Sequence, residues 1–442
     1  MHKHQEFEEA RFAARGWIAI IAICLLFAPK VNLIEVPGQT AGLRVDDLVL
    51  AVLAVPLAMA YRGLERDRVC LWIAVVVALG GVSCVVGDGN VLYAARLLEY
   101  AVFLLAGRFS GLDMGRVAKV WIGTQLSVAC LQELHIVGVF RDGIYLVPQQ
   151  VDRAFGTTGG PWELAAVTGL ASVVALATHQ RHDAKRVLVH VAALAIQILA
   201  ESRTGLVVQS FILCFDLVGA RLGPAAVLTT CGLAIVVACE VVIADRLDTS
   251  ALVAAARGLG GDEPSALHEL AEVEGLANVD DLSMAVRAEK WSFTSSTWLQ
   301  GGWLAILLGV GQGHFGPAVD GGWLRILCES GIIGLMAYIG FLAALRRTVA
   351  SGWTVPVTRL GGEWATCLLI AFAAHMVFID VHLSYKTMAF LLLLAGSLAA
   401  CPVRPSWSTW IDRYGGVRLP AGVTRQVARG GRHFGVSEAS DA

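Results

Sequence analysis

Charged residues gather in the stretch from Leu308 to Leu335, where a glycine-rich turn leads into a long apolar segment. His314 lies in the turn, and Asp320, Arg325 and Glu329 follow it. Ionisable groups at the edge of a bilayer are costly to place and usually serve a function. A carboxylate or an imidazole there can accept a proton from an attacking hydroxyl group. Asp320 is our first candidate for a general base and His314 our second, although Asp320 could instead cap the next helix and His314 could be a hydrogen-bonded interfacial residue.

Arginine residues stand in or beside several other turns of the chain. A guanidinium group carries a permanent charge on a planar fork of donors that matches the oxygens of a phosphate. The arginines in such positions are Arg44, Arg96, Arg153, Arg203 and Arg287.

Two of these arginines stand close to acidic residues that offer a structural alternative. Arg44 precedes Asp46 and Asp47, either of which could cap a helix with Arg44 as its counter-ion. We favour capping for these two acids. Arg96 lies three residues before Glu99, so the two could form an ion pair on one helical face.

The other three arginines occupy different contexts. The segment from Arg153 to Glu163 is glycine-rich and ends in Pro161-Trp-Glu, which suits a helix N-terminus that attracts anions, although an ordinary tight loop explains it as well. Arg203 could pair with Glu201, but an arginine in so short an outer turn opposes the usual charge bias and favours a functional role. Arg287 could be a solvated charge on a helix.

The composition indicates an all-α polytopic membrane protein. Of 442 residues, 56% are hydrophobic and 16% are charged, and the mean hydropathy is +0.65. About twelve apolar runs have the length that crosses a hydrocarbon core. They begin near Trp17, Asp47, Val69, Leu92, Val117, Pro161, Val187, Thr204, Leu222, Trp323, Glu363 and Lys386.

Lysine and arginine favour one set of connecting segments by about two to one, which predicts that both termini are cytoplasmic. The chain then divides into nine membrane helices within 1–244, an extracytoplasmic loop over 245–322, three further membrane helices within 323–401 and a basic cytoplasmic tail over 402–442. Within the loop we expect a helix capped by Asp280 or Asp281 and an interfacial helix within Ser296–Gly311. The acidic residues near the N-terminus favour a retained first helix over a cleaved signal peptide.

The ten cysteines lie in or beside apolar runs without a CxxC pair, so we interpret them as small core residues. No acidic cluster or His/Cys spacing indicates a metal site. The formal net charge of −2 gives no indication of nucleic-acid binding.

Several short motifs occur in one order around the predicted loop. Together they resemble the O-antigen ligase and Wzy-type polysaccharide polymerase superfamily, most clearly between about Ala200 and Tyr338. The matching segments are Ser202–Gly205, Arg287 with Trp291 four residues later, Gly309–Gly311 and Glu329–Gly334, with weaker matches at Arg96–Tyr100 and Arg153–Glu163.

One position departs from the pattern of the ligases in this superfamily. They carry a His-Asn type of pair shortly before the glycine of the span that follows the loop. This chain has Asp320-Gly321 there, followed after nine residues by Gly331. The replacement of histidine by aspartate favours the polymerase branch.

The resemblance implies a glycosyltransferase of GT-C-like architecture in the bacterial inner membrane, with its active site facing the periplasm. The donor would be an oligosaccharide on undecaprenyl diphosphate and the acceptor a sugar hydroxyl on a second lipid-linked unit. Arg203 and Arg287 would hold the negative charge that grows on the diphosphate, with Arg44, Arg96 and Arg153 as helpers. The reaction would invert the anomeric centre without a metal or cofactor. A chain-length regulator and a flippase are the expected protein partners, besides membrane lipids.

Three other functions compete with this interpretation. A ligase would transfer the glycan to lipid A core. A transporter of lipid-linked polysaccharide would suit a twelve-span count, although we find neither repeat symmetry nor matching broken helices. A non-enzymatic scaffold for polysaccharide export is the third alternative.

Overall fold

The computed structural model describes residues 2–29, 32–36, 39–60, 67–141, 144–150, 153–179, 183–230, 282–316, 319–353 and 361–399. All of them belong to one compact unit, residues 1–400. The predicted tail and half of the predicted loop, mainly residues 245–281, lie outside the described residues.

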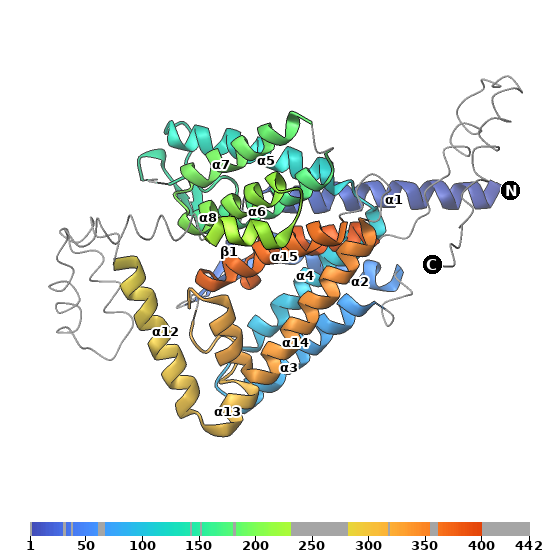
Figure 1. Cartoon of the computed structure of the whole chain (residues 1–442). Helices are drawn as coiled ribbons and strands as arrows, with labels where there is room; N and C mark the ends of the chain where they lie inside the picture. Colours follow the sequence, from blue (N-terminus) through green and yellow to red (C-terminus); the bar gives the residue numbers. More distant parts are fainter. Residues whose placement is uncertain are drawn as a thin grey trace, which may run out of the picture. The chain divides into compact units, whose positions relative to one another are not determined.

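Within these residues the structure is predominantly α-helical (Figure 1). The helices before the large loop are α1 (His2–Phe27), α2 (Val45–Ala60), α3 (Arg68–Val86), α4 (Val91–Ser110), α5 (Met114–Glu133), α6 (Pro161–Ala177), α7 (Lys185–Leu199) and α8 (Arg203–Leu217). The later helices are α12 (Leu282–Gln300), α13 (Gly302–Leu308), α14 (Gly322–Gly352), α15 (Gly361–Phe378) and α16 (Tyr385–Ala399). Three-residue 3₁₀ turns lie at Pro148–Gln150 (η2) and Val381–Leu383 (η3).

The predicted apolar runs coincide with helices. The expected starts at Val69, Trp323 and Lys386 each fall one residue inside a helix, namely α3, α14 and α16. The run predicted from Leu222 begins as a helix over 222–230 and continues outside the described residues. α1 differs, because it extends through a polar segment before its apolar part, Ala14–Phe27.

Two helices are buried on nearly every side and organise the others. α6 and α16 are apolar all round, which is typical of a helix in the centre of a bundle. α16 packs against α4, α14 and α6, and α14 packs against α3 and α15. Figure 1 shows α14 and α3 running alongside each other. α5, α7 and α8 pack around α6. The starts of α6 and α16 are therefore held in the interior, next to the turns that carry the candidate residues.

Three helices among the described residues are long and apolar enough to cross a membrane: α3, α14 and α15. α6, α16 and the second half of α1 are apolar but shorter. Large apolar side chains also point outward from many helices, for example Val52 and Val85, which are 75% and 85% exposed. Together these features describe an all-α membrane protein.

Two short antiparallel hairpins were not expected from an all-helical pattern. β1 (Asn32–Val36) pairs with β2 (Gln39–Arg44), and β3 (Val139–Arg141) pairs with β4 (Ile144–Leu146). The first hairpin leads directly into α2, so it delivers Arg44 to the start of that helix.

The C-terminal part of the predicted loop contains two helices. α12 occupies the segment in which a helix was expected, while the proposed caps Asp280 and Asp281 lie outside the described residues. The expected interfacial helix is divided between the end of α12 and the seven-residue α13, because Gly302 adopts a positive φ of 77°. α13 packs against α14 and α3.

Candidate active site

Contacts between helix ends join the candidate segments at one end of the bundle. Glu163, at the start of α6, accepts hydrogen bonds from the Ser384 hydroxyl (2.6 Å) and the Lys386 backbone N–H (3.0 Å). The Tyr100 hydroxyl of α4 donates to the Leu383 carbonyl at 2.8 Å. These bonds place the starts of α6 and α16 and the middle of α4 side by side.

The segment that carries Asp320 joins the same end through the turn before α16. The Asp380 carboxylate accepts hydrogen bonds from the backbone N–H groups of Val319 (2.9 Å) and Gly321 (3.2 Å). On the other side of this segment, the Asn90 N–H donates to the Gln312 carbonyl at 2.6 Å. The segments that carry Glu163 and Asp320 thus meet at the turn before α16.

Asp320 has an unusual backbone and a partly exposed carboxylate. Its φ of 58° is in the left-handed region, which aspartate tolerates better than most residues. The Lys290 ammonium lies 2.8 Å from the Asp320 carboxylate, and these two side chains are 33% and 34% exposed. The Trp291 indole N–H donates to the Asp320 carbonyl at 3.1 Å. Since Arg287 precedes Lys290 by three residues on α12, it shares the helix face that contacts Asp320.

A buried charge network holds the turn from which Asp320 projects. The fully buried Arg325 guanidinium lies 3.1 Å from both the Asp380 and the Glu329 carboxylates. It also donates to the Gly316 carbonyl at 2.6 Å and lies over the Tyr93 ring. A buried guanidinium needs such partners to offset its desolvation. The network fixes both ends of the segment that contains Asp320.

The glycine turn before this segment closes on a break in α14. Gly331 interrupts the helix with a φ of 68°, which frees carbonyl groups one turn earlier. The Val310 and Gly311 N–H groups donate to the Cys328 and Glu329 carbonyls at 2.9 and 3.1 Å. A Cβ on Gly309 would lie 2.1 Å from the Glu329 oxygen. Glycine is therefore required for this close approach.

Arg44 and Glu99 have unsatisfied polar atoms at the same end. Arg44 is 3% exposed, and its Nε and Nη1 atoms have no hydrogen-bond partner. The expected cap is present in part, because the Asp47 carboxylate accepts from the Arg44 backbone N–H at 3.0 Å. Glu99 Oε2 is buried without a hydrogen bond, and Arg96 is close enough to act on its charge.

The Arg153 guanidinium and the Glu201 carboxylate form an exposed ion pair of 2.8 Å. Arg203 follows Glu201 by two residues in the chain. Glu201 has a φ of 48°, and Ser202 caps α8 by accepting from the Gly205 N–H at 3.1 Å. Arg203 is exposed at the first position of α8. The predicted turn is therefore a helix N-terminus, which attracts anions.

His314 is exposed in the glycine turn, and its ring makes an edge contact with Phe315 at 5.0 Å. The imidazole is therefore accessible to a ligand. Among the described residues, no hydrogen bond orients its ring. Asp320 is better oriented, so it stays our first candidate for the base.

Sequence reasoning missed Asp380 and His382, and it named Lys386 only as the start of an apolar run. Lys386 is 1% exposed, and its ammonium donates to the Leu26 and Ala28 carbonyls at the end of α1. The available signal was the polar segment Ile379–Lys386 between two apolar runs. Polar groups that interrupt an apolar pattern need partners inside the bundle.

Asp380 and His382 lie outside the spans and have shifted pKa values. Burial acts against ionisation of Asp380, but the Arg325 guanidinium and the Val319 N–H outweigh it and hold the pKa of this carboxyl below its usual range. Burial lowers the pKa of His382 to about 4, although Asp380 partly opposes this effect. His382 is therefore neutral at pH 7.

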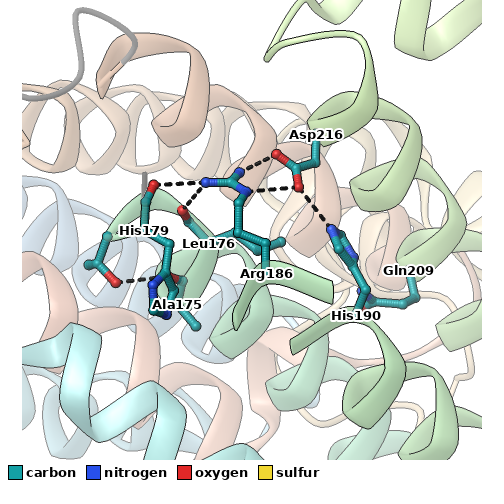
Figure 2. A network of polar contacts seen from close by, with 8 residues as sticks. Ala175, Leu176, His179, Arg186, His190, Gln209 and Asp216 are labelled. Carbon is teal, nitrogen blue, oxygen red and sulfur yellow. Dashed lines mark hydrogen bonds and ion pairs between the residues drawn. The ribbon is translucent and has the colours of Figure 1, made fainter. Parts of the chain in front are cut away.

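A second polar network lies at the opposite ends of α6, α7 and α8 (Figure 2). Arg186 forms an ion pair with Asp216 and donates to the Leu176 and His179 carbonyls at 2.9 and 2.8 Å. His190 Nε2 lies 3.0 Å from the same Asp216 carboxylate. These groups satisfy one another, so the network joins three helices and offers no open ligand position.

Comparison with known proteins adds little to this geometry. Neither protein-family profiles nor curated protein sequences give a match. A chain in the solved structure titled "Structural coordination of polymerization and crosslinking by a peptidoglycan synthase complex" is similar with a TM-score of 0.39 and 16% identity, over 75% of this chain and 95% of that chain. Among the described residues, no group of three His, Cys, Asp or Glu side chains is arranged as metal ligands.

Proposed function

We propose that the protein is a glycosyltransferase that polymerises lipid-linked oligosaccharide units at the periplasmic face of a bacterial inner membrane. The observation that carries the proposal is the partly exposed Asp320 carboxylate beside the cationic face of α12. A proton acceptor and guanidinium groups at one end of a membrane bundle suit transfer from a diphosphate-linked donor. The motif resemblance described above supports the same reaction.

In this mechanism the acceptor sugar hydroxyl attacks the anomeric carbon of the donor. A new glycosidic C–O bond forms while the bond from the anomeric carbon to the diphosphate oxygen breaks. The hydroxyl proton passes to Asp320, and the bonding electron pair leaves on the diphosphate. Arg203 and Arg287 hold the charge that grows there, with Arg44, Arg96 and Arg153 as additional ligands. Inversion follows from a single displacement.

The polymerase assignment can be tested with purified protein and undecaprenyl-diphosphate-linked repeat units. We expect longer lipid-linked glycans with wild-type protein, and none with Arg203→Ala or Arg287→Ala. Arg346→Ala is the matched control, because Arg346 is an exposed arginine in the C-terminal half of α14.

Each result would separate the competing functions. Full activity of both arginine variants would refute their role in holding the diphosphate. Transfer of glycan to added lipid A core, without chain growth, would identify a ligase instead. Absence of any glycan transfer by wild-type protein would support a transporter or scaffold.

A further inference from the structure

A cavity of about 250 Å³ lies where the end of α1 meets the starts of α2 and α16. Its walls include Leu25 and Pro29 at and after the end of α1, Val45 and Asp46 in α2, and Tyr385 and Lys386 in α16. The lining combines apolar side chains with one cationic and one anionic residue. Such a mixture suits an amphipathic ligand better than a sugar alone.

Arg44 is the group near this cavity that is least satisfied by the protein. Its guanidinium lies 5.8 Å from the centre of the Tyr385 ring, which lines the cavity. Nε and Nη1 have no hydrogen-bond partner, although the residue is only 3% exposed. The Tyr385 hydroxyl is likewise unpartnered at 2% exposure.

Buried donors of this kind require an acceptor. A guanidinium cannot lose its charge, and leaving its N–H groups unpaired in a buried position is strongly unfavourable. The nearby Asp47 carboxylate accepts from the Arg44 backbone, and one of its oxygens is itself unpartnered. A phosphate oxygen would satisfy Arg44 with a charge-assisted bond, and a P–OH group or a hydroxyl of the headgroup could donate to Asp47.

An apolar stripe on α2 leads away from the same cavity. Val45, Leu48, Val52 and Val55 follow one another at spacings of three and four residues and are 45%, 49%, 75% and 63% exposed. This spacing places them on one face of the helix. Val45 belongs to both the stripe and the cavity wall. A molecule with its head in the cavity could therefore lay an apolar chain along α2.

We propose that this cavity binds the phosphate headgroup of an anionic lipid, with Arg44 as the phosphate ligand beside the cavity and the α2 stripe as the contact for the first part of the apolar chain. Lys386 adds a fixed positive charge in the wall, since its ammonium is held by the Leu26 and Ala28 carbonyls. The further step that the lipid is a polyprenyl diphosphate rests on the proposed function. A phospholipid offers the same headgroup chemistry.

Binding to the purified full chain in detergent, followed by native mass spectrometry, tests the site without requiring turnover. The probes are undecaprenyl diphosphate, dioleoyl phosphatidylglycerol and inorganic pyrophosphate. We expect Arg44→Gln to raise the Kd for undecaprenyl diphosphate by about tenfold or more. Tyr385→Phe removes only a hydroxyl without a protein partner, so it should fold normally and weaken binding about two- to fivefold.

Arg346→Gln, which removes an exposed guanidinium from α14, is the matched control and should leave the Kd unchanged. An unchanged Kd in Arg44→Gln would overturn the site. Equal affinity for phosphatidylglycerol would support the site but overturn its assignment to the polyprenyl carrier. Tight binding of pyrophosphate alone would overturn the role of the α2 stripe. Arginine-dependent lipid binding without glycan transfer would refute the proposed function and leave this site standing.

Discussion

At the scale of single residues, substitutions of Asp320 can separate the effect of its charge from the effect of its backbone conformation. Its left-handed φ of 58° suits asparagine as well as aspartate. We therefore predict that Asp320→Asn folds normally but lowers the rate of glycan transfer by about 10²–10⁴-fold, because the proton acceptor is lost. The measurement is the initial rate of chain extension with purified protein.

The Asp320→Glu variant serves as a comparison, because it keeps a carboxylate and loses the backbone preference. Partial activity in this variant would agree with a general base. Wild-type activity in Asp320→Asn would contradict the role of Asp320 as the general base. His314 would then be the remaining candidate. The thermal unfolding temperature of each variant should be recorded, since Lys290 loses its ion-pair partner in Asp320→Asn.

His382 gives a prediction for the pH dependence of stability. Burial lowers its pKa from 6.5 to about 4, so the unfolded chain binds a proton in this range that the folded protein excludes. Stability should thus be constant above about pH 6.5 and fall as the pH decreases toward 4, by about 2 kcal/mol at pH 5. Asp380, with a lowered pKa, loses its contribution only below this range.

The test compares thermal unfolding in detergent at pH 7 and pH 5 for wild-type protein and His382→Gln. The variant should show a smaller decrease in unfolding temperature between the two pH values, because glutamine does not titrate. An equal decrease in both proteins would mean that other groups dominate acid destabilisation.

The candidate site was predictable only in those residues that stand out from a local pattern. Asp320 and Arg203 were chosen as candidates because a charge at the edge of an apolar run is conspicuous. Asp380 was missed because its role depends on Val319, Gly321 and Arg325, which lie about sixty residues earlier in the chain. No spacing rule along the sequence reveals partners so far apart.

At the scale of elements, the break in α14 is the feature that shapes the site. Gly331 has a φ of 68°, and a Cβ there would lie 2.2 Å from the Leu307 carbonyl oxygen. We predict that Gly331→Ala lowers the free energy of unfolding by about 1–3 kcal/mol or more, because backbone strain adds to a clash with main-chain atoms. Thermal unfolding in detergent measures the change.

Gly123→Ala is the matched control, since an added Cβ at this position in α5 meets no atom within 4 Å. Alanine in a helix interior should leave α5 unchanged or stabilise it by about 0.5–1 kcal/mol. If Gly331→Ala were as stable as Gly123→Ala, the closure of the glycine turn on α14 would not be a rigid feature.

Helix positions were predicted well and their irregularities poorly. Apolar runs of sufficient length fix where a helix lies, as the starts of α3, α14 and α16 show. The β1–β2 hairpin and the break at Gly331 were not predicted. The hairpin is a short local pairing within a segment that the sequence pattern assigns to no element. The break at Gly331 depends on its contact with Leu307, which lies 24 residues earlier, and a lone glycine within an apolar run is compatible with an intact helix.

At the scale of the whole bundle, the two ends of the helices differ in chemistry. One end combines unsatisfied polar atoms at Arg44 and Glu99 with a partly exposed carboxylate at Asp320. At the other end, Arg186, Asp216 and His190 satisfy one another and join α6, α7 and α8 (Figure 2). An open polar end and a closed polar end suit a protein that acts on one side of a membrane.

The positive-inside bias predicts that the open end faces the periplasm, and site-directed labelling can check this prediction. Glu201 marks the open end and Arg116 the start of α5 at the other end, and their side chains are 56% and 85% exposed. We predict that a membrane-impermeant thiol reagent labels Glu201→Cys in spheroplasts, whereas Arg116→Cys reacts only after lysis. We expect this result because short connecting segments with an excess of Lys and Arg are retained in the cytoplasm.

Labelling should be read for each peptide by mass spectrometry, so that the native cysteines do not interfere. Cys130, which is exposed near the end of α5 that lies opposite Arg116, provides an internal comparison in both variants. Labelling of Arg116→Cys in intact spheroplasts, with protection of Glu201→Cys, would reverse the orientation. Asp320 would then face the cytoplasm, and a reaction on periplasmic lipid-linked units would be excluded, whatever the chemistry of the site.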